Sequence, residues 1–371
     1  MKCLHILPMN KLSGAEKLAL ILCKNIKKYE PIVVCGGDNL KGIFEDHGIK
    51  SYAIDFKNNN LLKSANELNR IIKEQDIKLV HAHDNNASIC AYLAKTIYMC
   101  KFKLISHIHN CYPWLQGNNK NKIIDKIVRK KYDHNIACGK LVYDYYTKYT
   151  DYINSKNTTI LSNAIDIDDI RNIKYQNEDL KSKYSISKDK KVIGFVGRIS
   201  EQKGILPFIT EFKNHKEKFN DCVFLLIGSG DQDEEAKKLI REYELQDYFI
   251  LTGHEDDVYK FYPIIDIFFL PSLYEGLPMV ILEAMSFKKP IVAMNVGSIY
   301  EVVKNEYNGY LIDEKQYEEF IHRLEVLKND ETKLENYGEN SFKIIDENYN
   351  IENYQDDISK LYDRLLNDNK N

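Results

Sequence analysis

The sequence predicts an α/β protein made of two doubly wound parallel-sheet domains, and three observations support this. Short apolar runs rich in β-branched residues alternate along the whole chain with stretches of helical spacing. The runs are apolar on both faces, which is typical of parallel strands covered by helices on both sides. A polar stretch, Lys174–Lys190, interrupts this alternation once, and 371 residues are more than one domain usually holds.

The first block, residues 1–173, is expected to hold six strands joined mostly by helices. Its predicted strands are Cys3–Leu7, Ile32–Cys35, Lys78–Ala82, Lys103–Ile108, Asn135–Cys138 and Thr158–Leu161. Its predicted helices are Ala15–Ile26, Leu62–Lys73 and Ala87–Tyr98.

The second block begins at residue 174 and repeats the pattern. Its predicted strands are Val192–Val196, Val223–Ile227, Phe249–Thr252, Ile267–Leu270 and Ile291–Ala293. Its predicted helices are Leu206–Phe219, Glu234–Tyr243, Met279–Phe287, Tyr317–Leu327 and, at the end of the chain, Tyr354–Leu366.

The charge balance excludes a strongly basic nucleic-acid binder and a strongly acidic tail protein. Lys and Arg number 52 against 55 Asp and Glu, which leaves a formal net charge of −3. The charge is unevenly divided, with +9 on residues 1–173 and −12 on residues 174–371. Two surfaces of opposite sign suggest two different partners.

The cysteines and the hydropathy pattern indicate a cytoplasmic protein. Most of the eight cysteines lie in apolar runs and none forms a Cys-x-x-Cys pair, so we expect free thiols in a reducing compartment. The first residues are too soon broken by Pro8 to form a signal peptide, and no uncharged run is long enough for a membrane helix.

Three strand ends carry candidate ligand-binding residues, because ligands of doubly wound sheets bind at the carboxyl ends of the strands. The loop Asn10–Glu16 opens a helix, and Gly14 would let a phosphate or sugar approach its backbone. An ordinary strand–helix turn explains this loop equally well.

The loop Gly197–Gly204 follows the first strand of the second block. Arg198 and Lys203 lie in it between two glycines, where they can clamp a diphosphate from two directions. A solvated loop with two ordinary cations is the alternative.

The stretch Pro271–Ala284 combines a turn, a helix start and two carboxylates. Pro278 is expected at the first helical position, and the amides of Gly276, Leu277 and Met279 then form an anion site at the helix N-terminus. Glu283 falls on an apolar helix face, where a carboxylate needs a partner such as a ribose hydroxyl pair. Alternatively, Glu275 is a helix cap and Glu283 a salt-bridged helix residue.

Together, Arg198, Lys203, Glu275 and Glu283 around Gly276–Pro278 resemble the donor site of retaining GT-B glycosyltransferases of family four, particularly the capsular and exopolysaccharide members. The resemblance covers nearly the whole chain. It implies two Rossmann-like domains facing across a cleft, with residues 1–173 on the acceptor side and 174–352 binding a nucleotide sugar. It also implies that a C-terminal helix, about 353–371, crosses back to the first domain.

The resemblance assigns a role to each matched position. Arg198 and Lys203 would bind the diphosphate, Glu283 the ribose, and Glu275 with the Gly276–Met279 amides the donor sugar and phosphates. Gly253 and His254 would lie against the base, and His109 would face the donor sugar. The catalytic candidates are thus His109, Arg198, Lys203 and Glu275; the donor-binding candidates are Gly14, Arg198, Lys203, Gly253, His254, Glu275, Gly276, Leu277, Pro278, Met279 and Glu283. Ser13 replaces a glycine common in the family, which puts close phosphate contact at that residue in doubt.

The implied reaction is transfer of a sugar from a nucleotide diphosphate, a UDP-sugar, to a glycan on a lipid carrier, with retention. We expect no cofactor and no metal, because Arg198, Lys203 and the helix N-terminus would neutralise the leaving phosphate. Two Asp-x-Asp pairs imitate a metal motif: we interpret Asp166/Asp168 as an interdomain turn and Asp231/Asp233 as a helix cap.

The histidine pairs His81/His83 and His107/His109 each fall on one side of a predicted strand. A zinc site is conceivable there, but no Cys or Glu stands at metal spacing, so structural roles are favoured for His81 and His107.

The segment Asn118–Lys131 is the most basic part of the first domain. It pairs apolar residues at helical spacing with six cations: Lys120, Lys122, Lys126, Arg129, Lys130 and Lys131. Such a helix can dock on the inner face of an anionic membrane, which would suit a lipid-linked acceptor. The equal alternative is a surface helix whose apolar face belongs to the core.

Two other functions stay open at this point. One is a sugar-nucleotide epimerase of the same fold, and the other is a catalytically silent nucleotide-sugar-binding subunit. The complete set Arg198, Lys203, Glu275 and Glu283 argues against the silent subunit. No nucleic-acid partner is expected.

Overall fold

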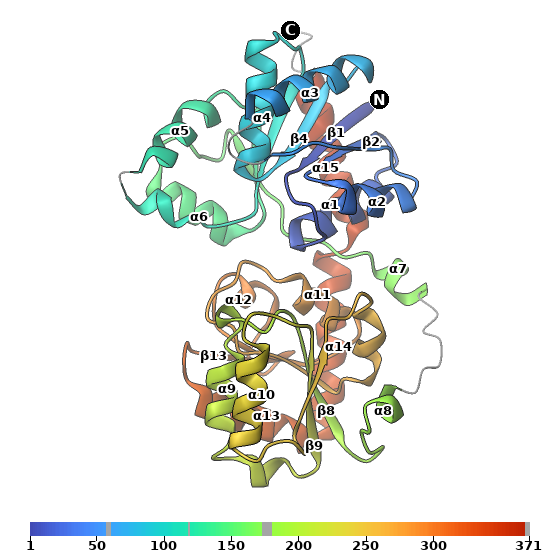
Figure 1. Cartoon of the computed structure of the whole chain (residues 1–371), viewed down its shortest axis with the longest axis vertical. Coiled ribbons are helices and arrows are strands. Elements are labelled where there is room, and N and C mark those ends of the chain that lie inside the picture. The colour runs from blue at the N-terminus through green and yellow to red at the C-terminus, as the bar shows by residue number, and fades with distance from the viewer. Residues whose placement is uncertain (57–60, 118, 173–179, 368–371) are drawn as a thin grey trace. The chain divides into compact units, whose positions relative to one another are not determined.

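A computed structural model describes residues 1–56, 61–117, 119–172 and 180–367 of the chain (Figure 1). The chain forms two compact units: unit 1 is residues 1–164 with 351–371, and unit 2 is residues 165–350. The sequence places the boundary at residue 173, inside a stretch (173–179) that lies outside the described residues. In the structure, Ile165 already pairs with Asn350 of unit 2, so the boundary falls before it. By these bounds unit 1 holds 28 basic and 19 acidic residues and unit 2 holds 24 and 36, so their net charges are still +9 and −12.

Unit 1 is built on a seven-stranded parallel sheet in the order β3-β2-β1-β4-β5-β6-β7. Its strands are β1 (Lys2–Leu7), β2 (Glu30–Cys35), β3 (Ser51–Ala53), β4 (Leu79–His83), β5 (Lys103–Ile108), β6 (His134–Ala137) and β7 (Thr158–Ile160). The strand order reverses between β1 and β4, so the loops after these two parallel strands diverge there and leave room for a ligand. The sequence missed β3, because three residues are too few to show a period.

Helices cover both faces of this sheet. They are α1 (Gly14–Asn25), α2 (Asp38–Asp46), α3 (Leu61–Glu74), α4 (Asp84–Ile97), α5 (Lys120–Arg129), α6 (Lys140–Tyr149) and α15 (Ile351–Asn367), with a 3-10 turn η1 (Pro113–Gln116). Helices α3 and α4 pack on the face that carries Leu4 and Val80, whereas α1 and α15 pack on the face that carries Cys3 and Leu79. Alternate residues of each strand are therefore buried on opposite faces.

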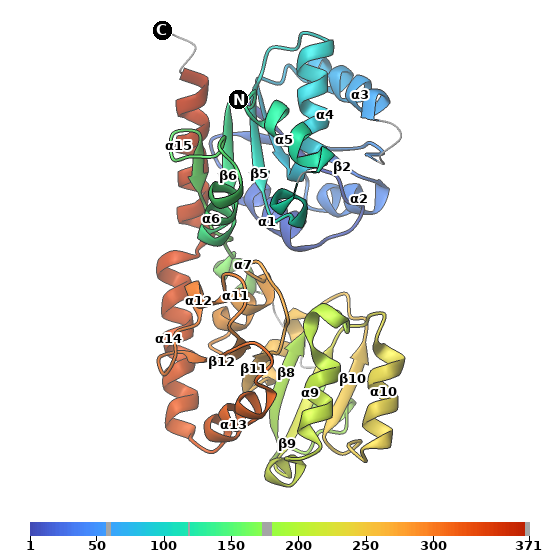
Figure 2. The same ribbon diagram turned by 90° about the vertical axis from the view of Figure 1, so that its left-hand side faces the viewer.

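The C-terminal helix α15 belongs to unit 1, although its sequence follows unit 2 (Figure 2). Its apolar side, with Ile358 and Tyr362, packs on α1 and the sheet. The Asp363 carboxylate also accepts hydrogen bonds from Tyr29 Oη at 2.7 Å and Lys28 Nζ at 2.5 Å. These contacts explain why the chain returns to its first unit.

Unit 2 is built on a six-stranded parallel sheet in the order β10-β9-β8-β11-β12-β13. Its strands are β8 (Lys191–Val196), β9 (Cys222–Ile227), β10 (Phe249–Gly253), β11 (Ile267–Leu270), β12 (Ile291–Met294) and β13 (Gly309–Ile312). Its helices are α7 (Ile167–Asn172), α8 (Leu180–Lys183), α9 (Ile205–Phe212), α10 (Asp233–Glu242), α11 (Met279–Ser286), α12 (Ile299–Val302), α13 (Tyr317–Lys328) and α14 (Glu331–Asn348), with 3-10 turns η2 (Glu201–Lys203), η3 (Lys216–Phe219) and η4 (Tyr259–Ile264). Here the strand order reverses between the neighbouring strands β8 and β11.

One predicted helix of unit 2 is wrong in extent. The sequence predicts a helix over Leu206–Phe219, but α9 ends at Phe212 and a separate 3-10 turn follows. The break lies at Lys213–His215, where His215 N bonds back to Phe212 O in a tight turn. Phe212 and Phe219 still meet in the core, with ring centroids 5.3 Å apart, which explains why the apolar spacing resembled one helix.

Helix α5 settles one alternative from the sequence and corrects one residue. Ile123, Ile124 and Ile127 are exposed by 61, 45 and 59 %, so most of the apolar side is not core. Arg129, predicted as one of six surface cations, is instead buried. It lies 2.7 Å from Asp125 and also donates to Ser106 and Asn135. Among the described residues, no helix is long and apolar enough to span a membrane.

The buried pair of Arg129 and Asp125 makes unit 1 sensitive to substitution. We expect Arg129→Met to destabilise unit 1 by about 3–5 kcal/mol, because the Asp125 carboxylate then stays buried without a cation. Urea unfolding followed by tryptophan fluorescence measures this change in unit 1 alone, since Trp114 is the single tryptophan of the chain.

Lys126→Met on the same helix is the matched control. Lys126 pairs with Asp151 at 2.9 Å in an exposed position, so its loss should leave the transition unchanged. Equal transitions for the two variants would show that the buried pair is not needed for stability.

Candidate functional site

In unit 2, two loops meet at the carboxyl ends of β8 and β11, where the strand order reverses. Leu273 N donates to Gln202 O at 2.8 Å, and Gln202 Nε2 donates to Tyr274 O at 3.0 Å. Gly204 has φ +65°, and a Cβ there would lie 2.2 Å from Pro271 O, so only glycine permits this approach. These contacts join the loops after β8 (residues 197–204) and β11 (residues 271–278) into one wall of the candidate site.

Lys203 and Glu275, one from each loop, form the central ion pair of this wall. Their side-chain atoms Nζ and Oε1 lie 2.6 Å apart, and the side chains are only 14 and 6 % exposed. The sequence placed both residues in the site, and the structure brings them together. Arg198, on the same loop as Lys203, is exposed. A partly buried ammonium and a guanidinium on one loop are suited to bind a diphosphate.

The start of α11 adds a partial positive charge to the same strand edge. The helix begins at Met279 with Pro278 as its N-cap, φ −73° and ψ 129°, and not as its first helical residue as predicted. Its extended ψ keeps Pro278 outside the helix. Ser298 N donates to Gly276 O at 2.9 Å, which fixes the turn before α11. Leu277 and Met279 are buried.

Glu283 on α11 is fully buried and has partners within the protein. Its Oε2 accepts a hydrogen bond from Tyr262 Oη at 2.7 Å, and its Oε1 lies 3.4 Å from Tyr259 Oη. The sequence showed a carboxylate on an apolar face, and it did not reveal these tyrosines of η4. The role of Glu283 toward a ribose stays a prediction.

The turn after β10 carries the two residues predicted to lie against a base. Gly253 has φ +76°, and its carbonyl accepts from Gly228 N at 3.0 Å, which ties it to the end of β9. The His254 side chain is 76 % exposed and lies 3.3 Å from Asp256. The contact of Gly253 and His254 with a base stays a prediction.

In unit 1, a cavity of about 920 Å³ opens at the carboxyl ends of β1 to β5. Asparagines and aspartates dominate its polar lining: Asn10, Asp55, Asp84, Asn85, Asn86, Asn110, Asn121 and Asp125. Tyr112 and Trp114 add a stacked aromatic pair, with ring centroids 5.2 Å apart. Amides and carboxylates beside flat rings are suited to bind a hydroxyl-rich ligand.

Asp84 is the residue of this cavity that the sequence analysis most clearly missed. It has φ +65°, an uncommon conformation for a residue other than glycine and one that often marks functional sites. Its Oδ1 accepts from Tyr112 Oη at 2.8 Å. Its position directly after β4 was the available signal.

Gly14 begins α1, with Ser13 as the N-cap. Ser13 Oγ donates to the Glu16 carboxylate in the first turn, and burial raises the pKa of Glu16. This buried acid lies where a phosphate would approach the amides of α1. The contact predicted for Gly14 stays a prediction.

His109 lies just after β5 and is half-buried. Its Nε2 is 3.0 Å from His83 Nδ1, and its ring stacks on His107 with centroids 4.0 Å apart. Burial lowers the pKa of His109, and the Asp84 carboxylate partly opposes this shift. His109 belongs to unit 1 and Glu275 to unit 2, so its predicted position toward a donor sugar stays a prediction.

The two Asp-x-Asp pairs have local structural roles. Asp166 Oδ1 accepts from Asp169 N at 2.8 Å and so caps α7. The cap predicted for α10 is wrong: its N-cap is Gln232, whereas Asp233 is its first residue and accepts from Gly230 N at 2.9 Å. The described groups that could hold a metal are instead two sets of histidines in unit 1, His5/His81/His83 and His83/His107/His109.

Family models match both units of the chain. Residues 12–169 match the model described as Glycosyltransferase Family 4, and residues 176–344 match Glycosyl transferases group 1. Together the two models span most of the sequence, and each corresponds to one doubly wound unit.

Related proteins and solved structures with similar folds include several glycosyltransferases. The chain is 24 % identical over 385 residues to the UDP-Gal:alpha-D-GlcNAc-diphosphoundecaprenol alpha-1,3-galactosyltransferase of Escherichia coli, covering 97 % of this chain and 96 % of the relative. It is 28 % identical over 192 residues to the capsular polysaccharide biosynthesis glycosyltransferase CapM of Staphylococcus aureus, about half of each chain. The structure of Anabaena Alr3699/HepE in complex with UDP-glucose superimposes with a TM-score of 0.84 at 20 % identity, covering 98 % of this chain and all of that one. A glycosyltransferase structure from Rickettsia africae gives a TM-score of 0.85 at 20 % identity, covering 98 % of each chain.

The geometry of Lys203 predicts a measurable contribution to diphosphate binding. We expect Lys203→Gln to weaken binding of UDP by about ten- to a hundredfold, because a charged hydrogen bond is lost. Glutamine keeps a neutral donor for Glu275, so the wall itself should persist. Isothermal titration calorimetry measures the change.

Lys237→Gln serves as the control, since Lys237 forms an exposed ion pair with Glu234 on α10 of the same unit. If both variants lose the same affinity for UDP, the effect comes from the net charge of unit 2 and Lys203 has no specific role in binding.

Proposed function

We propose that this chain, a glycosyltransferase with the GT-B fold, transfers a sugar from UDP-sugar to a lipid-linked glycan during surface polysaccharide biosynthesis. The transfer is metal-independent and retains the anomeric configuration. The observation that carries the donor half of the proposal is the half-buried pair Lys203–Glu275 beside the start of α11.

The donor half rests on charge. Cleavage of a nucleotide sugar adds one negative charge to the diphosphate, on its terminal phosphate, and groups already oriented toward that charge lower the barrier. Lys203 is held in place by Glu275, and Arg198 on the same loop is exposed. With the helix dipole of α11, these cations supply the neutralisation that a divalent ion supplies in other transferases. Retention follows from the family resemblance.

The acceptor half rests on the cavity of unit 1. Its asparagines and aspartates can bind the hydroxyls of a sugar, and Trp114 with Tyr112 can pack against the apolar face of its ring. The E. coli relative is named for an acceptor in which GlcNAc is linked to diphosphoundecaprenol. A sugar on a lipid diphosphate is therefore the acceptor class that we assign to this cavity.

Helix α5 supports a lipid-linked acceptor independently. Ile123 and Ile127 are exposed near Lys120, Lys130 and Lys131, a pattern typical of helices that lie on anionic membranes. On the same helix, Asn121 and Ile124 line the cavity. A membrane-bound acceptor would reach this cavity from the surface on which α5 rests. We place the protein at the cytoplasmic face of the cell membrane as a peripheral protein.

An activity assay with the full chain tests the function. UDP-sugars are supplied singly with a sugar linked to polyprenyl diphosphate, and products are identified by mass spectrometry. We expect an acceptor extended by one sugar, with none in the Lys203→Gln variant. Conversion of one UDP-sugar into another without acceptor would identify an epimerase, and binding without either product would identify a silent subunit; both would contradict the proposal. NMR of the product reads the anomeric configuration.

The exposed isoleucines predict membrane binding. The protein should sediment with vesicles containing phosphatidylglycerol at low salt, and Ile123→Ser/Ile127→Ser should weaken this at least about tenfold through lost apolar burial. Ile97→Ser is the matched control, because Ile97 is an exposed isoleucine on α4 of the same unit. If the wild-type protein fails to sediment with such vesicles, the membrane part of the proposal is wrong.

A further inference from the structure

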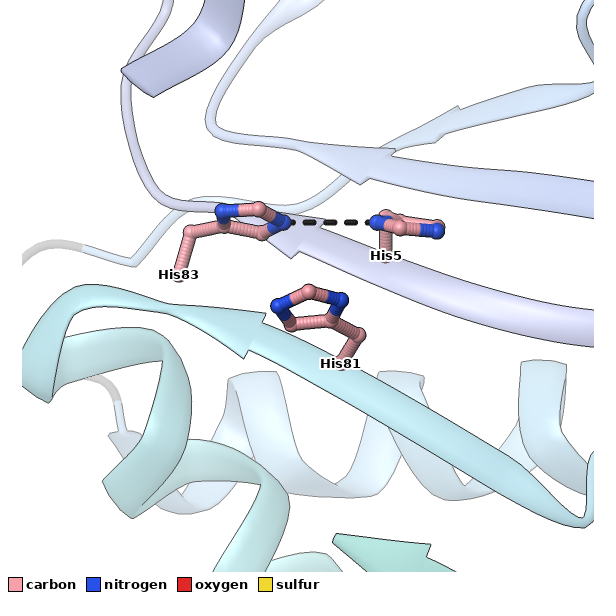
Figure 3. A group of neighbouring side chains, drawn as sticks. All are labelled: His5, His81 and His83. Atoms are coloured by element: carbon pink, nitrogen blue, oxygen red, sulfur yellow. Dashed lines mark hydrogen bonds between the residues drawn. The ribbon is translucent and has the colours of Figure 1, made fainter. Parts of the chain in front are cut away.

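Five histidines of three neighbouring strand segments form two rows in the core of unit 1. His5 on β1 is the register partner of His81 on β4, and His83 is the partner of His107 on β5. His109 follows two residues after His107, so all five rings lie on one face of the sheet, under α1 and α15. Figure 3 shows His5, His81 and His83 of this group, with the rings of His5 and His83 directed at each other.

The first row runs from the sheet interior to the strand edge. His5 Nδ1 lies 3.3 Å from His83 Nε2, and His83 Nδ1 lies 3.0 Å from His109 Nε2. The second row is Tyr362 Oη, His81 and His107, with contacts of 2.6 and 3.2 Å. The rows stack on each other, with centroids 4.5 Å apart for His81 and His83.

The geometry favours hydrogen bonds over a shared metal ion. The ring centroids of His5 and His83 are 5.6 Å apart, and those of His83 and His109 are 5.3 Å apart. Each centroid distance exceeds the corresponding N···N distance by about the width of one imidazole ring, so the rings lie end to end, with interplanar angles of 27° and 15°. Each nitrogen therefore faces the next nitrogen directly, whereas ligands of a tetrahedral metal converge on a third point.

The direction of the protons in the first row follows from its inner end. A neutral imidazole has one N–H donor and one acceptor nitrogen, so a row of neutral rings must point its donors one way. His5 Nε2 lies 3.7 Å from Cys3 Sγ. Burial raises the pKa of the Cys3 thiol to about 12 and lowers that of His5 to about 4, so the thiol keeps its proton and the ring is neutral.

With the Cys3 thiol donating to His5 Nε2, His5 Nδ1–H donates to His83, and His83 Nδ1–H donates to His109 Nε2. In the opposite direction the His5 N–H would donate to a sulfur, a weak acceptor, and the Cys3 thiol proton would have no acceptor among the described side-chain contacts; in the outward direction every proton between Cys3 and His109 has an imidazole nitrogen to bind. The outward direction is therefore the more stable one.

We propose that His83 and His5 are positioning residues that hold His109 in one neutral tautomer, with its proton on Nδ1 and Nε2 occupied by His83. His109 then meets a ligand as an N–H donor, able to bind a sugar or phosphate oxygen, and not as a base. The importance of this tautomer for transfer rests on the proposed function, whereas its existence does not.

Long-range ¹H–¹⁵N NMR of the full chain labelled with ¹⁵N-histidine tests the proposal, because the two tautomers give different ring-nitrogen shifts. The His109 signals are assigned by their loss in His109→Gln. We expect the Nδ1–H form in the wild-type protein; the Nε2–H form would overturn the proposal without any further variant.

Variants of His83 then test the cause. His83→Phe should shift His109 toward the Nε2–H tautomer, and His83→Gln should preserve Nδ1–H, because the amide can donate to His109 and accept from His5. His107→Gln is the control, since His107 stacks on His109 at 4.0 Å but shares no described hydrogen bond with it. A His83→Phe spectrum identical to wild type would contradict the role of His83.

Two further measurements distinguish the tautomer proposal from a role of His109 in transfer and from a metal site. We expect His83→Phe to lower kcat for transfer about tenfold with a smaller change in donor KM, and His83→Gln to restore it. A changed tautomer with unchanged kcat would remove His109 from the mechanism and leave the tautomer assignment intact. One equivalent of Zn²⁺ should leave the spectrum unchanged, and a stoichiometric shift of the His5 and His83 signals would show a metal site instead.

Discussion

Parallel strand pairing is the constraint on which both candidate sites depend. When every strand of a sheet runs the same way, the loops after all of them meet at one edge, and the point where the strand order reverses opens room for a ligand. In unit 2 this point lies between β8 and β11, and it brings Lys203 and Glu275 within 2.6 Å although 72 positions separate them. In unit 1 the same edge forms the cavity lined by Asp84 and Trp114.

The sequence predicts best those helices and strands that are long enough to show a regular spacing of apolar residues. Most long helices and the central strands follow from apolar spacing, and the candidate site in the loops after β8 and β11 follows from Gly204, Lys203 and Glu275 at strand ends. Partners brought together by register could not be predicted in this way. His5 carries no motif of its own, and its place beside His81 depends on how β1 pairs with β4. Likewise, Tyr262 satisfies Glu283 from a turn that shows no periodic pattern.

Charged residues that look alike in the sequence can differ in burial, and therefore in role. Arg129 and Lys126 lie on one helix, yet Arg129 is enclosed with Asp125 while Lys126 lies at the surface. The isoleucines of α5 show the reverse, since the sequence left open whether they lie in the core or at the surface, and the structure exposes them. The same principle explains how an acidic unit 2, with a net charge of −12, can bind an anion: two cations and a helix N-terminus are placed at one strand edge.

The central claim, that unit 2 binds the diphosphate of a uridine nucleotide sugar, is tested most directly by thermal unfolding of the full chain with a ligand panel. The panel contains UDP, several UDP-sugars, the corresponding GDP and ADP compounds, and inorganic pyrophosphate. A ligand that binds only the folded state raises the unfolding temperature with concentration. The account predicts the largest rise with UDP or one UDP-sugar, lost in Lys203→Gln. No rise with any nucleotide, or an equal rise with pyrophosphate alone, would contradict it.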